Sequence, residues 1–180
     1  MRWIAGLLLL LGMTGLLRAE VIDLREAGRL EIIAAGDWKI AGEDQGDRFV
    51  VTITPNGKVN AGARLVVSVT PADDLPDPGR LRHRVHALCL PFAEKSVERK
   101  VTLEKFYRKE GFGFHATFTD PELVGRPPAP GQCKIATYGV VRLAPRVYVA
   151  ITLLADGVME TGYQALLGAV EGMELRPARR

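Results

Sequence analysis

His115 is a candidate for acid–base chemistry or ligand binding, because an unperturbed imidazole titrates at about pH 6.5 and this one lies in a strand-like segment. Residues 112–119 alternate apolar and polar types, which predicts a strand with His115 and Thr117 on one face. In a later alternating segment, Tyr138 and Arg142 also share a face. If the two faces coincide, these four residues line a polar groove that could bind a ligand. The alternative is that His115 is a hydrogen-bonded histidine on the surface.

Neither serine of the sequence is placed for nucleophilic catalysis. Ser68 lies in an apolar strand pattern and Ser96 in a charged stretch, and neither has the flanking glycines of a nucleophile elbow. The two cysteines, Cys89 and Cys133, lack a recognisable catalytic signature. They could pair as a disulfide, which would stabilise the fold by roughly 4 kcal/mol, or remain two separate buried thiols.

Metal binding has one candidate pair, His83 and His86, on a predicted helix. Histidines at this spacing can share a ligand face. However, His83 lies nearly opposite the apolar stripe of the helix, and the pair is surrounded by cationic residues, namely Arg80, Arg82 and Arg84. The acidic loop before the helix lacks the ordered spacing of a calcium-binding loop, although it contains Asp73, Asp74 and Asp77. We therefore expect no metal and no cofactor.

The N-terminus has the three zones of a secretory signal peptide. Arg2 provides the positive start, residues 3–17 are uncharged, and Ala19 is a small residue at the expected cleavage point. A membrane-spanning helix needs about 20 apolar residues, so this shorter run is not expected to anchor the protein. We predict a signal peptide at 1–19 and a soluble exported protein, periplasmic or secreted, with no stable membrane insertion after cleavage.

The remaining residues, 20–180, correspond to one domain of ordinary size. Of the 24 basic and 21 acidic residues of the chain, Arg2 and Arg18 belong to the predicted signal peptide, so the domain is nearly neutral. A nearly neutral exported domain gives no reason to expect a nucleic-acid partner. Residues 175–180 are predicted to form a loose tail.

Two helices are predicted by periodicity and capping signals. Asp77 can cap a helix that begins at Pro78 and ends near Leu90, because Pro91 cannot donate an intrahelical hydrogen bond. Its predicted apolar stripe is Leu81, Val85, Leu88 and Phe92. A second helix is expected from the cap Asp156 to Gly172, with a stripe formed by Met159, Tyr163, Leu166, Leu167 and Val170.

Period-two alternation predicts that the rest of the domain is mainly β-strand, with a polar loop at 41–47. The predicted strands are 49–54, 64–70, 101–107, 112–119, 135–143, 147–154 and a short final strand at 173–175. The fold class is therefore α+β, with an antiparallel sheet of about six to eight strands and two principal helices.

The sequence resembles the PsbP-like fold, which is shared by many exported bacterial domains of unknown function. The features that carry the resemblance are Trp38 followed by RFVVTITP, and the ending VYVAITLLADGVMETGYQALLGAVEGMEL. The resemblance implies an α/β/α sandwich that ends in a strand, a helix and a short last strand. It implies no enzyme activity by itself, since a fold does not specify a function.

Together these observations favour an exported, non-catalytic domain that binds a partner protein or a small ligand. The alternative function is a small hydrolase or transferase with a dispersed site around His115. A third hypothesis is an assembly factor of the cell envelope.

Overall fold

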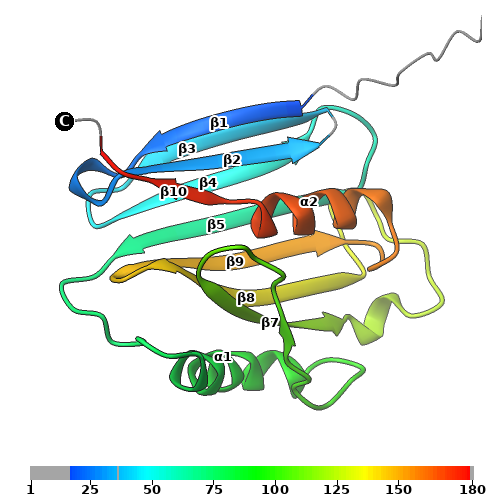
Figure 1. The fold of residues 1–180 in the computed structure, drawn as a ribbon. Helices are drawn as coiled ribbons and strands as arrows, with labels where there is room; N and C mark the ends of the chain where they lie inside the picture. Colours follow the sequence, from blue (N-terminus) through cyan, green and yellow to red (C-terminus); the bar gives the residue numbers. More distant parts are fainter. Residues whose placement is uncertain (1–16, 36, 179–180) are drawn as a thin grey trace, which may run out of the picture.

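A seven-stranded antiparallel sheet forms the middle layer of the computed structural model, which describes residues 17–35 and 37–178 (Figure 1). The strand order is β3-β4-β5-β9-β8-β7-β6. The strands are β3 (Trp38–Asp44), β4 (Arg48–Pro55), β5 (Ala61–Val69), β6 (Glu104–Lys105), β7 (Phe112–Thr119), β8 (Ile135–Ala144) and β9 (Val147–Ala155). This arrangement confirms the predicted α+β class.

The two faces of this sheet are covered by different elements (Figure 1). A three-stranded sheet of order β1-β2-β10 lies on one face together with helix α2 (Thr161–Glu171). Its strands are β1 (Leu17–Asp23), β2 (Arg29–Ala35) and β10 (Glu174–Arg176). Helix α1 (Pro78–Ala93) packs on the other face, over β7 and β8. Two short 3-10 helices, η1 (Arg25–Ala27) and η2 (Pro121–Leu123), lie in connecting segments.

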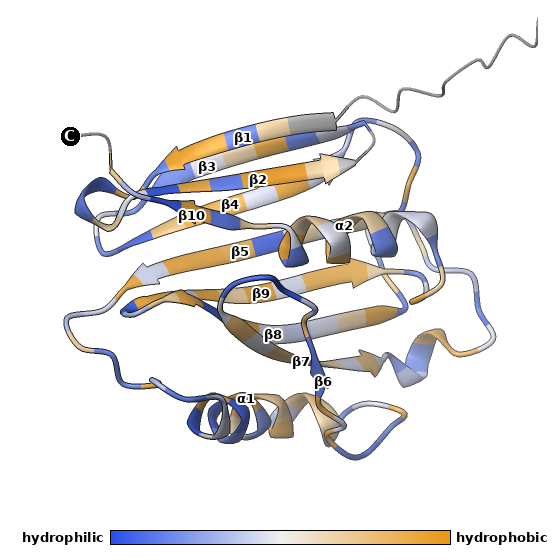
Figure 2. Ribbon diagram, viewed as in Figure 1, coloured by the Kyte–Doolittle hydropathy of each residue, from blue (hydrophilic) through white to orange (hydrophobic). Residues whose placement is uncertain are grey.

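The layers enclose two apolar cores. The larger core lies between the seven-stranded sheet and the layer of β1, β2, β10 and α2, and includes the fully buried Leu30, Leu65 and Leu166. The smaller core joins α1 to β7, β8 and β9, and includes Leu81 and Phe118. Figure 2 shows hydrophobic residues concentrated along the strands and hydrophilic residues in the loops and in the first half of α1. The period-two pattern therefore buries apolar side chains in both cores.

Helix α1 begins as predicted but ends later. The Asp77 side chain accepts a hydrogen bond from the Arg80 N–H at 2.9 Å, which confirms the cap. The helix runs through Pro91 to Ala93, so the predicted end near Leu90 is wrong. Proline removes only its own N–H from the helical hydrogen bonds. Beyond Pro91, the Glu94 N–H still donates to the Leu90 carbonyl at 3.1 Å.

The buried stripe of α1 also differs from the prediction. Cys89 and Ala93 are buried beside Leu81 and Val85, whereas Leu88 and Phe92 are 47% and 41% exposed. Helix α1 therefore packs on the sheet through residues spaced by four positions. It covers only the β7–β8 end of the sheet. Half-exposed apolar side chains remain along the border of the contact.

Helix α2 begins at Thr161, so the predicted start and cap at Asp156 are wrong. The Asp156 carboxylate instead accepts hydrogen bonds from Asn60 Nδ2 at 2.9 and 3.0 Å. Met159 precedes the helix and is 88% exposed, so it lies outside the stripe in which it was expected. The other predicted stripe residues are buried or half-buried, and the helix ends at Gly172 as predicted.

One predicted loop and one predicted strand differ from the structure. The loop expected at 41–47 is largely strand, because β3 continues to Asp44 through pairing with β4. The strand expected at 101–107 is reduced to Glu104–Lys105. The remaining predicted strands are present, including β10 at the end of the domain.

The predicted signal peptide lies mostly outside the described residues. Its last three positions, 17–19, form the first part of β1. The rest of β1, from Glu20 to Asp23, forms its own pairs with β2. None of the helices in the described part of the chain has the length and apolar character that crossing a membrane requires. The end of the predicted loose tail, residues 179–180, also lies outside the described residues.

Candidate functional site

The four residues predicted to form one polar groove lie on opposite faces of the large sheet. Tyr138 is paired with Ala116, so it shares the α1 face with Arg142. His115 is paired with Gly139 and lies on the α2 face with Thr117. Residues directly opposite in an antiparallel ladder point to the same face, so the alternation separates the two pairs. The structure therefore does not form the predicted groove.

His115 is packed inside the protein rather than exposed to solvent. Its side chain is only 4% exposed, and its ring lies 4.4 Å from the ring of Phe106. Burial lowers the pKa of His115, and the nearby Glu104 opposes this shift. No described residue makes a hydrogen bond to its Nδ1. Burial thus disfavours the charged form of His115.

Two glycines make room for the ring that covers His115. A Cβ atom at Gly113 or Gly139 would come within 2.9 Å of the Phe106 ring. Phe106 itself is tied to β7 by a hydrogen bond from its N–H to the Gly113 carbonyl at 3.1 Å. The glycines therefore leave room for an aromatic ring close to the sheet beside His115.

Thr117 takes part in a buried group of hydroxyls. Its Oγ1 lies 2.7 Å from Oγ1 of Thr137, which lies 3.0 Å from the Tyr163 hydroxyl. Because Tyr163 belongs to α2, this group attaches α2 to the sheet. The three hydroxyls satisfy one another's hydrogen bonds in the core, so no ligand is needed to explain their positions.

Tyr138 and Arg142 are also occupied by internal contacts. Phe92 of α1 stacks on Tyr138 with ring centroids 3.8 Å apart. Arg142 donates to both carboxylate oxygens of Asp73 at 3.1 and 2.5 Å. The Tyr148 hydroxyl donates to the same carboxylate. The hydrogen bonds from Arg142 and Tyr148 lower the pKa of Asp73 to about 2, so the acidic residue is a structural ion-pair partner.

The two cysteines are free, so the disulfide considered from the sequence is not formed. Cys89 on α1 lies with its Sγ 3.8 Å from the Tyr138 carbonyl oxygen. Cys133 lies before β8, with its Sγ 3.8 Å from Asn60 Oδ1. The fold places them in different surroundings. Burial raises the pKa of Cys89 to about 11, which makes it a poor thiolate nucleophile.

The candidate metal ligands are dispersed. His83 and His86 are exposed on α1. Asp77 caps that helix, and Asp73 binds Arg142. Within residues 17–35 and 37–178, no group of three or more His, Cys, Asp or Glu side chains is arranged to hold a metal ion.

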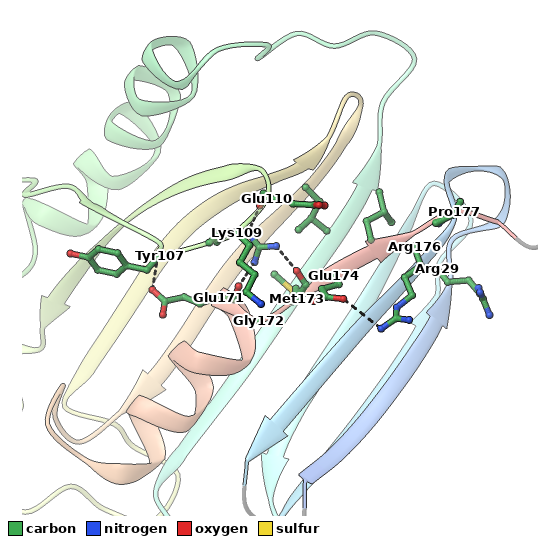
Figure 3. A pocket seen from close by; sticks show the side chains of 13 residues that line it. Arg29, Tyr107, Lys109, Glu110, Glu171, Gly172, Met173, Glu174, Arg176 and Pro177 are labelled. Atoms are coloured by element: carbon green, nitrogen blue, oxygen red, sulfur yellow. Dashed lines mark hydrogen bonds and ion pairs between the residues drawn. The ribbon is translucent and has the colours of Figure 1, made fainter.

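The structure contains a pocket that sequence reasoning missed. A cavity of about 950 Å³ lies between β10, the C-terminal end of α2 and the loop at 107–110 (Figure 3). Its apolar lining comes from Leu143, Met173 and Leu175. The charged lining residues are Arg29, Arg108, Lys109, Glu110, Glu171, Glu174 and Arg176. These residues come from four separate segments of the chain, so no local motif marks the pocket.

Arg108 fastens the pocket loop to the end of α2. Its guanidinium donates to the carbonyl oxygens of Val170, Glu171 and Met173, with a distance of 3.0 Å to that of Glu171. The N–H of Tyr107 donates to Glu171 Oε1 at 2.8 Å. A cation at the carboxyl end of a helix also interacts favourably with the helix dipole. This wall of the pocket is therefore fixed by its own side chains.

Several charges around the pocket are already neutralised, but Lys109 is not. Arg176 forms ion pairs with Glu31 at 2.5 Å and with Glu174 at 3.5 Å. The Lys109 ammonium has no hydrogen-bond or ion-pair partner among the described residues. Arg29 Nε is likewise buried without a partner in the described part of the chain. Among the lining residues of the described chain that form no ion pair, three are cations and two are carboxylates: Arg29, Arg108 and Lys109 against Glu110 and Glu171.

No protein-family model matches the chain, and no curated protein is significantly similar to it. The resemblance to the PsbP-like fold therefore stays a prediction. The α+β arrangement stands on the structure alone.

Proposed function

We propose that this protein is an exported, non-catalytic domain that binds a small organic anion with an apolar part. The binding site is the pocket between β10, the end of α2 and the loop at 107–110. The observation that carries the proposal is the uncommitted Lys109 ammonium beside an apolar lining in a cavity of about 950 Å³.

The size and lining of the pocket support this class of ligand. Small-molecule sites commonly have volumes of about 300–1,000 Å³ and combine apolar surface with a few polar anchors. Leu175 is the half-buried apolar residue of the lining, and the buried Leu143 and Met173 lie behind it. Lys109 supplies a charge that is not engaged by another described side chain, and Figure 3 shows it beside the end of α2. A carboxylate or phosphate would pair with this ammonium.

The positions of the candidate nucleophiles support binding rather than catalysis. Burial raises the pKa of both Cys89 and Cys133. Ser96 is buried, and its hydroxyl donates to the Ala93 carbonyl at 3.0 Å. A catalytic nucleophile needs a nearby base and an open approach for the substrate. The alternative of a hydrolase or transferase around His115 gains no support from the burial of that residue.

The proposal is tested by thermal unfolding of the purified protein with decanoate and with decanol as the uncharged control. We expect decanoate to raise the melting temperature and decanol to have little effect, because only the carboxylate can pair with Lys109. A ligand at 100 times its dissociation constant stabilises the folded state by about 2.7 kcal/mol. Lys109→Ala should abolish the decanoate effect.

Lys105→Ala is the matched control, since this exposed lysine lies on β6 outside the pocket lining. The control variant should keep the full response to decanoate. Equal stabilisation by decanol, or an unchanged response in Lys109→Ala, would contradict an anion site in this pocket. A complex with another protein that leaves the pocket residues accessible would instead favour the partner-protein hypothesis.

A further inference from the structure

The two edges of the large sheet differ in how they are protected. At the β7 edge, the Phe106 N–H bonds to the Gly113 carbonyl and the Val97 N–H to the Thr119 carbonyl, each at 3.1 Å. The segment from 97 to 106 therefore covers that edge. At the other edge, no strand of the described residues pairs with the outer side of β3, and residues 41–48 are exposed. Figure 1 shows β3 at the end of the sheet far from α1. An open edge is a template for pairing with another strand.

The hydrogen bonds of the β3–β4 ladder show which backbone groups point outward. Asp37 lies opposite Asn56 by continuation of the ladder register, and the Asn56 N–H donates to the Asp37 carbonyl at 3.0 Å. Hydrogen-bonded and non-hydrogen-bonded pairs alternate along an antiparallel ladder. Odd-numbered β3 residues therefore bond to β4, and the N–H and C=O groups of Ile40 and Gly42 point away from it.

The side chains of β3 are complementary to those of a second β3 in one register. Antiparallel pairing about a two-fold axis at Ala41 places Ile40 opposite Gly42 of the second copy, so their outward backbone groups meet. The same register places Lys39 opposite Glu43 of the second copy. Both side chains lie on the α1 side of the sheet, at the end that α1 does not reach, and both residues are exposed. Each interface then contains two cross-strand ion pairs, which stabilise antiparallel strands.

We infer that β3 is the interface of a homodimer in which two copies join their seven-stranded sheets about Ala41. Charged residues on an edge strand can also serve to prevent strand pairing. The neighbouring symmetric registers fit less well, because an axis at Ile40 sets Asp37 opposite Glu43 and an axis at Gly42 sets Lys39 opposite Gln45. The register about Ala41 alone among these three matches opposite charges.

Analytical ultracentrifugation of the protein purified after expression of the full sequence tests this inference. The wild type should sediment as a concentration-dependent dimer. Lys39→Glu places like charges opposite each other at both symmetric positions, so it should weaken the dimer by about tenfold or more. The double variant Lys39→Glu/Glu43→Lys restores opposite charges across the axis and should restore the dimer.

Arg84→Glu is the matched control, because it makes the same change of charge on the exposed side of α1. It should leave the dimer unchanged. A second variant, Gly42→Pro, removes an outward N–H while keeping the bonds to β4, and should also abolish dimerisation. A monomeric wild type, a Lys39→Glu dimer as tight as that of the wild type, or a double variant with a dimer as weak as that of Lys39→Glu would each overturn the inference.

Discussion

Asp73 joins the segment before α1 to the sheet through Arg142 and Tyr148. Its pKa of about 2 in the folded protein lies below its ordinary value of 3.8. The folded state therefore favours the charged carboxylate. The stabilisation is fully present above about pH 4 and is lost as the pH falls through about 2.

We predict that Asp73→Asn lowers stability at neutral pH and flattens the loss of stability between about pH 4 and pH 2. Arg142 would then remain in its partly buried position without an anionic partner. Urea unfolding midpoints measured across this pH range would show the change. Asp74→Asn is the control, because Asp74 is exposed beside the pair. An Asp73→Asn protein with the acid sensitivity of the wild type would contradict the prediction.

His115 contributes to stability with the pH dependence of a buried neutral imidazole. Burial lowers its pKa in the folded state, so the unfolded chain binds a proton more readily. Stability is therefore lost as the pH falls through the unfolded value of about 6.5. His115→Leu should remove this part of the acid sensitivity, which begins as the pH falls through about 6.5.

Thermal unfolding of His115→Leu and of the wild type across that range would test the prediction. His83→Leu provides a control, because His83 is exposed on α1. If the melting temperature of His115→Leu depends on pH as steeply as that of the wild type, His115 is not the titrating group. The sequence identified His115 as distinctive but not its burial, because alternation defines the face of a strand and not what covers that face.

At the scale of secondary-structure elements, one side chain links α2 to the pocket loop. Arg108 supplies hydrogen bonds to three carbonyl groups at the end of α2, and it is itself half-buried. Hydrogen bonds to charged groups contribute about 1.5–3 kcal/mol. Arg108→Ala should therefore lower the free energy of unfolding by roughly 1–3 kcal/mol.

Chemical denaturation of Arg108→Ala and Lys109→Ala separates a structural role from a binding role. Lys109→Ala should leave stability nearly unchanged, because the ammonium has no partner among the described residues. Equal stability losses in the two variants would argue against a special role of Arg108. The sequence placed both residues between two predicted strands, but only the structure showed that one of them caps a helix more than 60 residues away.

Local patterns predicted elements well where tertiary packing agrees with them. The alternation in 112–119 and the hairpin at 135–154 are confirmed as β7, β8 and β9. The prediction failed at Pro91, because packing of the last helical turn outweighs the loss of one hydrogen bond. It also failed at Asp156, because a long-range contact with Asn60 takes the carboxylate that was expected to cap α2.

At the scale of the whole molecule, the proposed signal peptide predicts a defined N-terminus of the mature protein. Cleavage after Ala19 would leave Glu20 to Asp23 paired with β2. We therefore expect mass spectrometry of the exported protein to find Glu20 as its first residue. A chain beginning at Glu20 should unfold at nearly the same temperature as one beginning at Leu17. An exported protein that retains Met1 would contradict cleavage.

The sequence by itself determined the α+β class, the alternating faces of the strands and the existence of both helices. These features depend on local periodicity, turn residues and caps, which are read along the chain. Only the tertiary structure decided which predicted polar residues meet. It separated His115 from Tyr138, left Cys89 and Cys133 unpaired, and built a pocket from residues as distant as Arg29 and Arg176. The physical reason is that strand order and layer packing bring together residues whose separation in the sequence carries no local signal.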